Sequence, residues 1–335
     1  MTTASVLLTV GTTWTANNDG CDKEERVGRT MRNVSAVAAR ELRETPATRE
    51  QAIRIMRDWI QKNTDIKNVR QDEAFLLRFL RHKKYSIPMA QQTLLKYLSL
   101  RKFYPSIFTK LDCEDPKIKD ILNNGYIAVS PVRDGKGRRV IVYNMGKFDA
   151  TKYNCWDMCR AHVIIYETLM EDPIDQIFGF SHVGDGSGST TAHVTTWNPI
   201  DFARLMKWGE QSIPMRHKEF QLVNVPAALK YIIDFATSKV SPKMSERLNI
   251  LTNIKTLQNH VDMSCLPTAY GGHIPLQDMI KFTRELLLEK RETILALDKM
   301  ELLSTKGIIS SRKPTNIVKG DNVSVEGSFR KLEID

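Results

Sequence analysis

The feature that most constrains this chain is the alternation of strand-like and helix-like segments between residues 126 and 254. Apolar, β-branched runs predict strands, and apolar residues at every third or fourth position predict the helices between them. Strands that alternate with helices form βαβ units, so we predict an α/β protein with a mostly parallel sheet. The predicted elements are strands at 126–129 and 140–143, a helix from Asn154, a strand at 176–183, a helix capped by Asn198, a strand at 220–225, a helix from Ala227 and a strand at 248–254.

The chain before this alternation has a purely helical pattern. Helices are predicted from a capping box at 48–51, over 72–80 and after Ser86. With 335 residues the chain can bury a core of ordinary size without disulfides or a metal. The predicted organisation is a mobile N-terminal tail over 1–45, a helical lobe over 46–112, an α/β domain with a C-terminal helix over 113–303 and a loose tail over 304–335.

Charge and composition narrow the class of protein. The 49 Lys and Arg exceed the 39 Asp and Glu, a net charge of +10, which predicts an anionic partner. Nucleic acid, an anionic membrane and phosphorylated small molecules all satisfy that condition. No apolar run is long enough to span a membrane, and the beginning of the chain lacks the pattern of a signal peptide. The cysteines are odd in number and scattered, which favours a reducing, cytoplasmic location: Cys21, Cys113, Cys155, Cys159 and Cys265.

The motifs that most often indicate catalysis do not fit here. Gly-Asp-Gly-Ser-Gly-Ser at 184–189 follows a predicted strand, but it lacks both the Gly-Lys-Ser/Thr of a phosphate loop and the spacing of a nucleophile elbow. We therefore expect a surface loop there, followed by a helix-poor segment. The histidines have no zinc-ligand spacing, and Cys155 and Cys159 read as buried thiols. We expect no enzyme activity, no cofactor and no metal.

Three stretches resemble the signatures of one family. The first stretch, 72–85, is similar to the helical N-terminal signature of that family. The second, Ile-Pro-Met-Arg at 213–216 followed by Leu-Val-Asn-Val-Pro at 222–226, is similar to the family's central element. The third, Leu-Pro-Thr-Ala-Tyr-Gly-Gly at 266–272, is similar to the sequence that ends the family's domain. Their order and spacing resemble the CRAL-TRIO family of lipid-transfer proteins. The resemblance implies a helical N-terminal lobe, an α/β lobe with an apolar lipid pocket, and a mobile helical gate over 227–248.

The resemblance also implies a site for an anionic head group. In a tocopherol carrier of this family, basic residues outside the pocket bind phosphoinositides, which include phosphatidylinositol bisphosphate. The corresponding positions are all basic here: Lys83, Arg216, Lys218, Lys243 and Arg247. Charge clusters of this kind are equally compatible with a solvated surface. With the resemblance, lipid head groups become the expected anionic partner, and nucleic acid is not expected.

Pocket and gate positions follow from the same alignment. The implied pocket residues are Cys159, His162, Tyr166, Phe180, Trp197, Leu205, Trp208, Ile213 and Met215. The implied gate residues are Tyr231, Ile232, Phe235, Val240 and Met244, although a helix packed on the core would show the same periodicity. Two departures stand out: His162 and Tyr166 are bulkier than their counterparts, and Gly184 replaces a large apolar residue.

The leading hypothesis is a non-enzymatic, monomeric cytoplasmic carrier that associates peripherally with membranes, such as those of endosomes. It would bind a retinoid, tocopherol, sterol-like or phospholipid ligand and exchange it at phosphoinositide-containing membranes. The alternative is a phosphoinositide-sensing signalling or interaction module that transfers no lipid. In that case Tyr166, Trp197 and Trp208 would fill the pocket.

Overall fold

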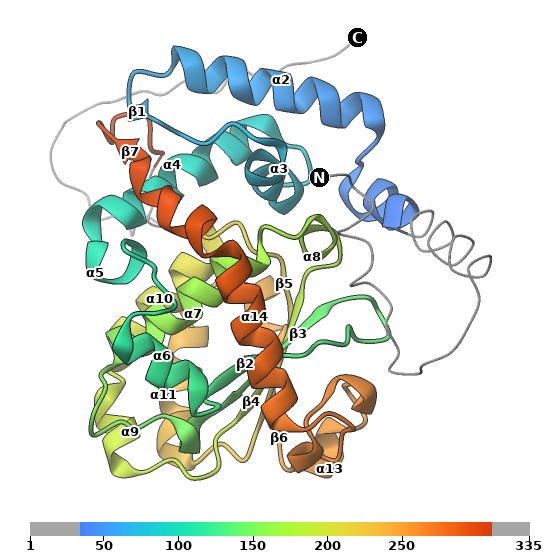
Figure 1. Ribbon diagram of the computed structural model, residues 1–335, viewed down its shortest axis with the longest axis vertical. Coiled ribbons are helices and arrows are strands. Elements are labelled where there is room, and N and C mark those ends of the chain that lie inside the picture. Colours follow the sequence, from blue (N-terminus) through green and yellow to red (C-terminus); the bar gives the residue numbers. More distant parts are fainter. Residues whose placement is uncertain (1–33, 310–335) are drawn as a thin grey trace, which may run out of the picture.

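Two lobes lie end to end and are joined by a long helix in the computed structural model, which describes residues 34–309 (Figure 1). The helical lobe forms one end. It consists of a helical segment over 34–42, α2 (Pro46–Lys62), α3 (Glu73–His82), α4 (Ile87–Phe103) and α5 (Pro105–Phe108). Helix α6 (Pro116–Asn123) follows in the chain and lies in the α/β lobe (Figure 1). Helix α14 (Leu276–Leu295) runs along the front of the molecule from the α/β lobe to the helical lobe (Figure 1). There β7 (Glu301–Leu302) pairs with β1 (Ile66–Lys67).

The α/β lobe contains a five-stranded sheet in the order β2-β3-β4-β5-β6. Strands β2 and β3 form an antiparallel hairpin, and the other neighbours are parallel, which confirms the predicted fold class. The strands are β2 (Ile127–Val129), β3 (Arg139–Asn144), β4 (Phe180–Asp185), β5 (His217–Val223) and β6 (Leu248–Leu251). The helices are α7 (Cys155–Leu169), α8 (Pro173–Phe178), α9 (Thr191–Thr196), α10 (Pro199–Gln211), α11 (Ala227–Thr237), α12 (Pro242–Ser245) and α13 (Ile254–Leu257), with short 3-10 turns at Met145–Lys147, Met263–Cys265, Thr268–Tyr270 and Ala296–Lys299.

The sheet separates two hydrophobic clusters because side chains alternate along each strand. In β3, Ile141 joins a cluster that continues through α7 into the helical lobe, where it includes Phe79. Its neighbours Val140 and Val142 point to the opposite face, where they pack with Met279 of α14. The larger cluster therefore belongs to both lobes.

The N-terminal boundary differs from the prediction. Residues 34–42 are helical rather than part of a tail, and Val37 and Leu42 are buried against Ile177 of α8. Helix α2 begins at Pro46, because the Thr45 hydroxyl accepts a hydrogen bond from the Thr48 backbone N–H at 3.1 Å. The capping box predicted at 48–51 is therefore wrong, since Thr48 is the third residue of the helix.

The predicted tails lie mostly outside the described residues, as does Cys21. The prediction for 1–33 and 310–335 is not addressed by the structure. Residues 304–309 are held against the helical lobe, because the backbone N–H groups of Ser304 and Gly307 donate to Asp65.

Two other predictions were wrong in the α/β lobe. Residues 176–178, predicted as the start of a strand, instead end helix α8, because Asp172 caps a helix that has Pro173 in its first turn. Gly179, with φ of 82°, then turns the chain into β4. The segment after the glycine-rich loop, predicted to be helix-poor, forms the short helix α9, whose first turn is closed by reciprocal hydrogen bonds between Thr190 and His193.

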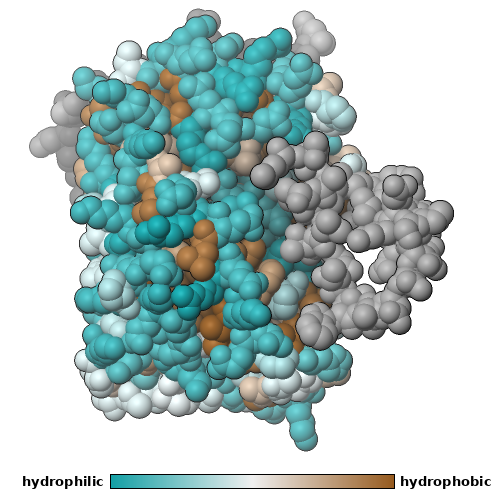
Figure 2. Space-filling model, in the orientation of Figure 1, coloured by the Kyte–Doolittle hydropathy of each residue, from teal (hydrophilic) through white to brown (hydrophobic). Residues whose placement is uncertain are grey.

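The surface that carries α14 is mostly hydrophilic, and its hydrophobic side chains form small separate patches (Figure 2). Within residues 34–309, no helix combines the length and hydrophobicity required to cross a bilayer.

Arg78 of α3 is the main polar link between the lobes. It donates to Glu167 of α7 at 2.8 Å and to Glu171 just beyond α7, and Tyr97 of α4 donates to the second oxygen of Glu167 at 2.8 Å. The Arg78 side chain is 0% exposed and that of Glu167 is 2% exposed. Buried charges are tolerated only when they are fully paired, so this network fixes α3, α4 and α7 relative to one another.

We predict that Arg78→Leu lowers the free energy of unfolding by about 3–5 kcal/mol, because it leaves the buried carboxylate of Glu167 without its cation, whereas Glu171 keeps its ion pair with Arg70. Urea denaturation of the full chain measures the change. Arg49→Leu is the matched control, since Arg49 pairs with Glu73 at the surface and its loss should change stability by less than about 1 kcal/mol. Equal effects of the two substitutions would contradict the assignment.

Candidate functional site

An apolar cavity of about 260 Å³ lies between α7, α10, α11 and the sheet. Most of the pocket residues expected from the sequence line it: Cys159, His162, Tyr166, Trp197, Leu205, Trp208 and Ile213. Asn154 caps α7, and the spacing of 159, 162 and 166 along this helix places the three side chains on one face. Trp208 closes the end near the helical lobe, where it packs on Tyr104 with ring centroids 4.2 Å apart.

Phe180 and Met215 do not line the cavity, contrary to the expectation. Each is 1% exposed and belongs to the main core. The cavity lies beside the carboxyl end of β4, whereas Phe180 begins that strand and Met215 precedes β5. The sequence reasoning missed several lining residues: Tyr126, Tyr143, Phe202, Met206, His217, Phe220, Leu222, Leu229 and Ile233. The alternation of β5 was the available signal for two of them, Phe220 and Leu222.

Tyrosine and histidine side chains form a polar strip within this apolar wall. The Tyr126 hydroxyl lies 2.7 Å from His162 Nε2, and the Tyr166 hydroxyl lies 3.0 Å from His162 Nδ1. His182 Nε2 lies 2.8 Å from His217 Nδ1. Burial lowers the pKa of His162 to about 4 and that of His217 to about 3, so both rings are neutral at neutral pH.

Gly184 explains how the wall tolerates these bulky side chains. A Cβ atom at this position would lie 2.7 Å from Leu222 Cδ2 and 3.0 Å from the Tyr143 ring. Both residues line the cavity, so glycine leaves the room that they occupy. Glycine at 184 therefore makes room for Tyr143 on β3 and Leu222 on β5.

A β-bulge in β5 divides its side chains between two sites. The residues at 180–181 of β4 pair with His217 and Glu219, so Lys218 is the extra residue of the bulge. As a result, two successive side chains point away from the cavity into a groove on the other side of the strand. The cavity receives His217, Phe220 and Leu222, and the groove receives Lys218, Glu219 and Gln221.

This groove has a volume of about 510 Å³ and a basic wall. It brings together Lys218, Lys243 and Arg247 of the five expected head-group residues, and adds Lys136. Burial lowers the pKa of Arg247 and, with repulsion from Lys96 and Lys243, the pKa of Lys83, which does not line the groove.

Arg216 is next to the groove but is engaged by the chain itself. It donates to Glu41 at 3.0 Å and to the backbone of α8, and Lys218 donates to the same Glu41 oxygen at 2.6 Å. Burial and the charge of Arg247 lower the pKa of Arg216 and Lys218 despite this carboxylate. The cations therefore repel one another, and an added anion would relieve that repulsion. This is the electrostatic property of an anion-binding site.

The expected gate contributes only part of its residues to the cavity. Ile232 of α11 and Met244 of α12 line it. Phe235 and Val240 are half-buried elsewhere, and Tyr231 is 68% exposed. One face of the 227–248 segment therefore closes the cavity, while Tyr231 points to solvent.

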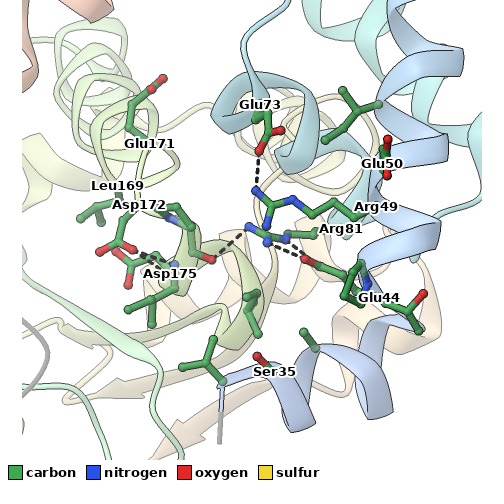
Figure 3. A pocket seen from close by; sticks show the side chains of 18 of the residues that line it. Ser35, Glu44, Arg49, Glu50, Glu73, Arg81, Leu169, Glu171, Asp172 and Asp175 are labelled. Atoms are coloured by element: carbon green, nitrogen blue, oxygen red, sulfur yellow. Dashed lines mark hydrogen bonds and ion pairs between the residues drawn. The ribbon is translucent and has the colours of Figure 1, made fainter. Parts of the chain in front are cut away.

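A larger cavity of about 1730 Å³ lies between the helical segment 34–42, α2, α3 and α8. Its wall carries charged side chains that are paired with one another, including Arg49 with Glu73 and Arg81 with Glu44 (Figure 3). We assign this space to the junction between the lobes because several of its charged side chains are already paired, while Glu50, Arg54 and Asp58 form no ion pair with any residue between 34 and 309. Within residues 34–309, no cluster of His, Cys, Asp and Glu side chains is arranged to hold a metal ion.

The neutral histidines predict a loss of stability in acid. The unfolded chain binds a proton at His162 below pH 6.5, whereas the folded chain binds it only below about pH 4. Stability is therefore lost as the pH falls through this window, by about 3 kcal/mol for this residue. His162→Gln should make the pH dependence of the unfolding free energy shallower by about one proton, because Gln retains a donor and an acceptor. Replacement of the exposed His260 by Gln is the control, and equal slopes for the two variants would contradict the prediction.

Comparisons with known proteins agree with this geometry. A family model described as "CRAL/TRIO domain" matches residues 123–272, and one described as "Pinta-like, UBA domain" matches residues 45–118. Clavesin-1 of Xenopus laevis is 30% identical over 248 residues, 74% of this chain and 75% of that protein. Clavesin-2 of Homo sapiens is 29% identical over 74% of this chain and 76% of its own length. The crystal structure of Sfh5 has a TM-score of 0.45 and 12% identity, covering 74% of this chain and 98% of that chain. The CRAL/TRIO model and the clavesin relatives confirm the resemblance seen in the three motifs, and the chain belongs to the CRAL-TRIO family of lipid-binding and lipid-transfer proteins.

Proposed function

We propose that this protein carries one apolar lipid in its cavity and exchanges it at phosphoinositide-containing membranes, where the basic groove binds the head group. The observation that carries the proposal is a wall shared by the two sites. Strand β5 presents side chains to both, and the segment from α12 to β6 places Met244 and Leu248 in the cavity and Lys243 and Arg247 in the groove. A head group bound in the groove therefore contacts the segment that closes the cavity.

The cavity supplies the driving force for cargo binding. Transfer of a methylene group from water to an apolar environment contributes about 0.8 kcal/mol, so a hydrocarbon chain partitions into such a space without any covalent step. The cavity persists although Tyr166, Trp197 and Trp208 line it. This remaining volume favours a carrier over a module whose pocket is filled.

The exposed side chains near the cavity suit contact with a lipid surface. Ile200 of α10 is 61% exposed and Tyr231 of α11 is 68% exposed, on two helices that pack against each other at the cavity. Lys243 is exposed and forms no ion pair with any residue between 34 and 309. In the proposed mechanism, the head group binds Lys218, Lys243 and Arg247, and α11 with α12 moves into the interface to open the cavity.

Two measurements test the proposal. Native mass spectrometry of the purified chain should detect a co-purifying lipid, and an empty protein under all conditions would favour the interaction module. Sedimentation with phosphatidylcholine vesicles that contain phosphatidylinositol bisphosphate measures membrane binding.

We predict that Lys243→Ala combined with Arg247→Ala weakens vesicle binding by roughly thirtyfold, because each lost charge removes about 1 kcal/mol near an anionic surface. The matched control is Arg54→Ala with Lys62→Ala, which removes the same charge from exposed positions of α2. Unchanged binding in the groove variant, or equal losses in both, would contradict the assigned site.

Glu41 pairs with two of the expected head-group residues, Arg216 and Lys218, so a head group must compete with its carboxylate for them. We predict that Glu41→Gln strengthens vesicle binding by about fivefold, since Gln keeps the shape but not the charge. Glu301→Gln in β7 changes the net charge equally and should have little effect. Weaker binding by Glu41→Gln would show that Glu41 organises the site instead of competing for it.

A further inference from the structure

We propose that the cavity selects a lipid whose polar group is a single uncharged oxygen, an alcohol or a carbonyl, and that Tyr166 and His217 hold this oxygen. The proposal rests on the carrier function above and adds the chemical class of the cargo. It follows from the hydrogen-bond donors that the folded chain leaves unused on one wall of the cavity.

The first unused donor comes from the chain of Tyr126, His162 and Tyr166. A neutral imidazole has one N–H, so the three groups together have three exchangeable protons. The two hydrogen bonds, at 2.7 and 3.0 Å, use two of them. For either tautomer of His162, one tyrosine keeps a free O–H. Both tyrosines line the cavity, but Tyr126 is 2% exposed whereas Tyr166 is half-buried, so we place the free proton on Tyr166, where a ligand can reach it.

The second unused donor comes from the pair of His182 and His217. One ring donates to the other across 2.8 Å. His182 Nδ1 is buried and has no hydrogen-bond partner within residues 34–309. A buried N–H without a partner is rarer than an under-satisfied acceptor, so His182 carries its proton on Nε2. His182 then donates to His217 Nδ1, which leaves His217 with its own N–H at Nε2 beside the cavity.

The two donor residues line the same cavity at neighbouring positions. The rings of Tyr166 and His217 have centroids 5.9 Å apart and are inclined at 68°. Gly209 keeps the approach to His217 open, since even a Cβ atom there would lie 3.9 Å from Nε2. An alcohol or carbonyl oxygen has two lone pairs, so one such atom satisfies both donors.

The same wall disfavours a charged head group. Among residues 34–309, no Lys or Arg lines the cavity, and its one lining carboxylate is that of Asp185. That carboxylate is held by the Ser187 hydroxyl at 2.8 Å and the Asn224 amide at 3.0 Å. A lipid carboxylate or phosphate would be buried beside a like charge without a cation, which is far more costly than burying a neutral oxygen.

Binding of dodecanol, dodecanoate and dodecane to the full chain tests the proposal, because the three ligands share one hydrocarbon chain and differ at its end. Trp197 and Trp208 line the cavity, so their fluorescence reports occupancy. At neutral pH we expect dodecanol to bind at least about tenfold more tightly than dodecanoate. Tyr166→Phe should weaken dodecanol binding by about tenfold and leave dodecane binding unchanged.

Tyr153→Phe is the matched control, because the Tyr153 hydroxyl donates to Asp120 away from the cavity. A second variant combines His182→Phe with His217→Phe, so that neither histidine is left without its hydrogen-bond partner. It should also weaken the binding of dodecanol selectively. Equal affinities for dodecanol and dodecanoate would overturn the proposal. So would a Tyr166→Phe variant that weakens the binding of dodecanol and of dodecane equally. Absence of binding by all three ligands would instead overturn the carrier function itself.

Discussion

The buried ion pairs of Arg78 determine how the rest of the molecule is placed. Glu167 and Glu171 lie on and just after the C-terminal turns of α7, and they bind a guanidinium that belongs to the other lobe. The opposite face of α7 carries His162 and Tyr166, which line the cavity. Buried charged side chains must keep their partners, so few other placements of these side chains are possible. The network therefore fixes the rotation of α7 about its axis. The polar strip of the cavity is therefore positioned by contacts on the far side of the helix.

Strand β5 and the segment from α12 to β6 separate two environments of opposite character. One side is apolar and carries neutral imidazoles. The other carries cations whose pKa values are lowered by burial and, for Arg216 and Lys218, also by repulsion from neighbouring cations. A single layer of backbone, that of β5 and the segment from α12 to β6, separates the cavity from the groove. A ligand in either site would therefore contact this backbone. A lipid and a head group need no long pathway to influence each other, because the two ligands would be separated by a single strand.

The sequence was sufficient for the fold class, the order of most elements and the family, because these depend on periodicity and on short motifs. It was insufficient where tertiary contacts override local preference. Residues 176–178 were predicted to begin a strand, yet they belong to a helix that Asp172 and Pro173 start. The helix over 34–42 is stabilised by burial against α8 and by Glu41, which pairs with side chains 175 and 177 positions away. The lining role of His217 was hidden because its neighbours Arg216 and Lys218 made it look like part of a basic cluster.

The bulge at Lys218 also has an evolutionary consequence. One inserted residue gives β5 its two successive groove-facing side chains and returns the alternation to the cavity at Phe220. A substitution in this strand changes the lining of one site. Deletion of a single residue would instead turn every side chain on one side of the deletion to the opposite face of the strand. We therefore expect related proteins to vary in the residue types of this strand while keeping its length, so that the lining of the cavity can change without loss of the basic groove.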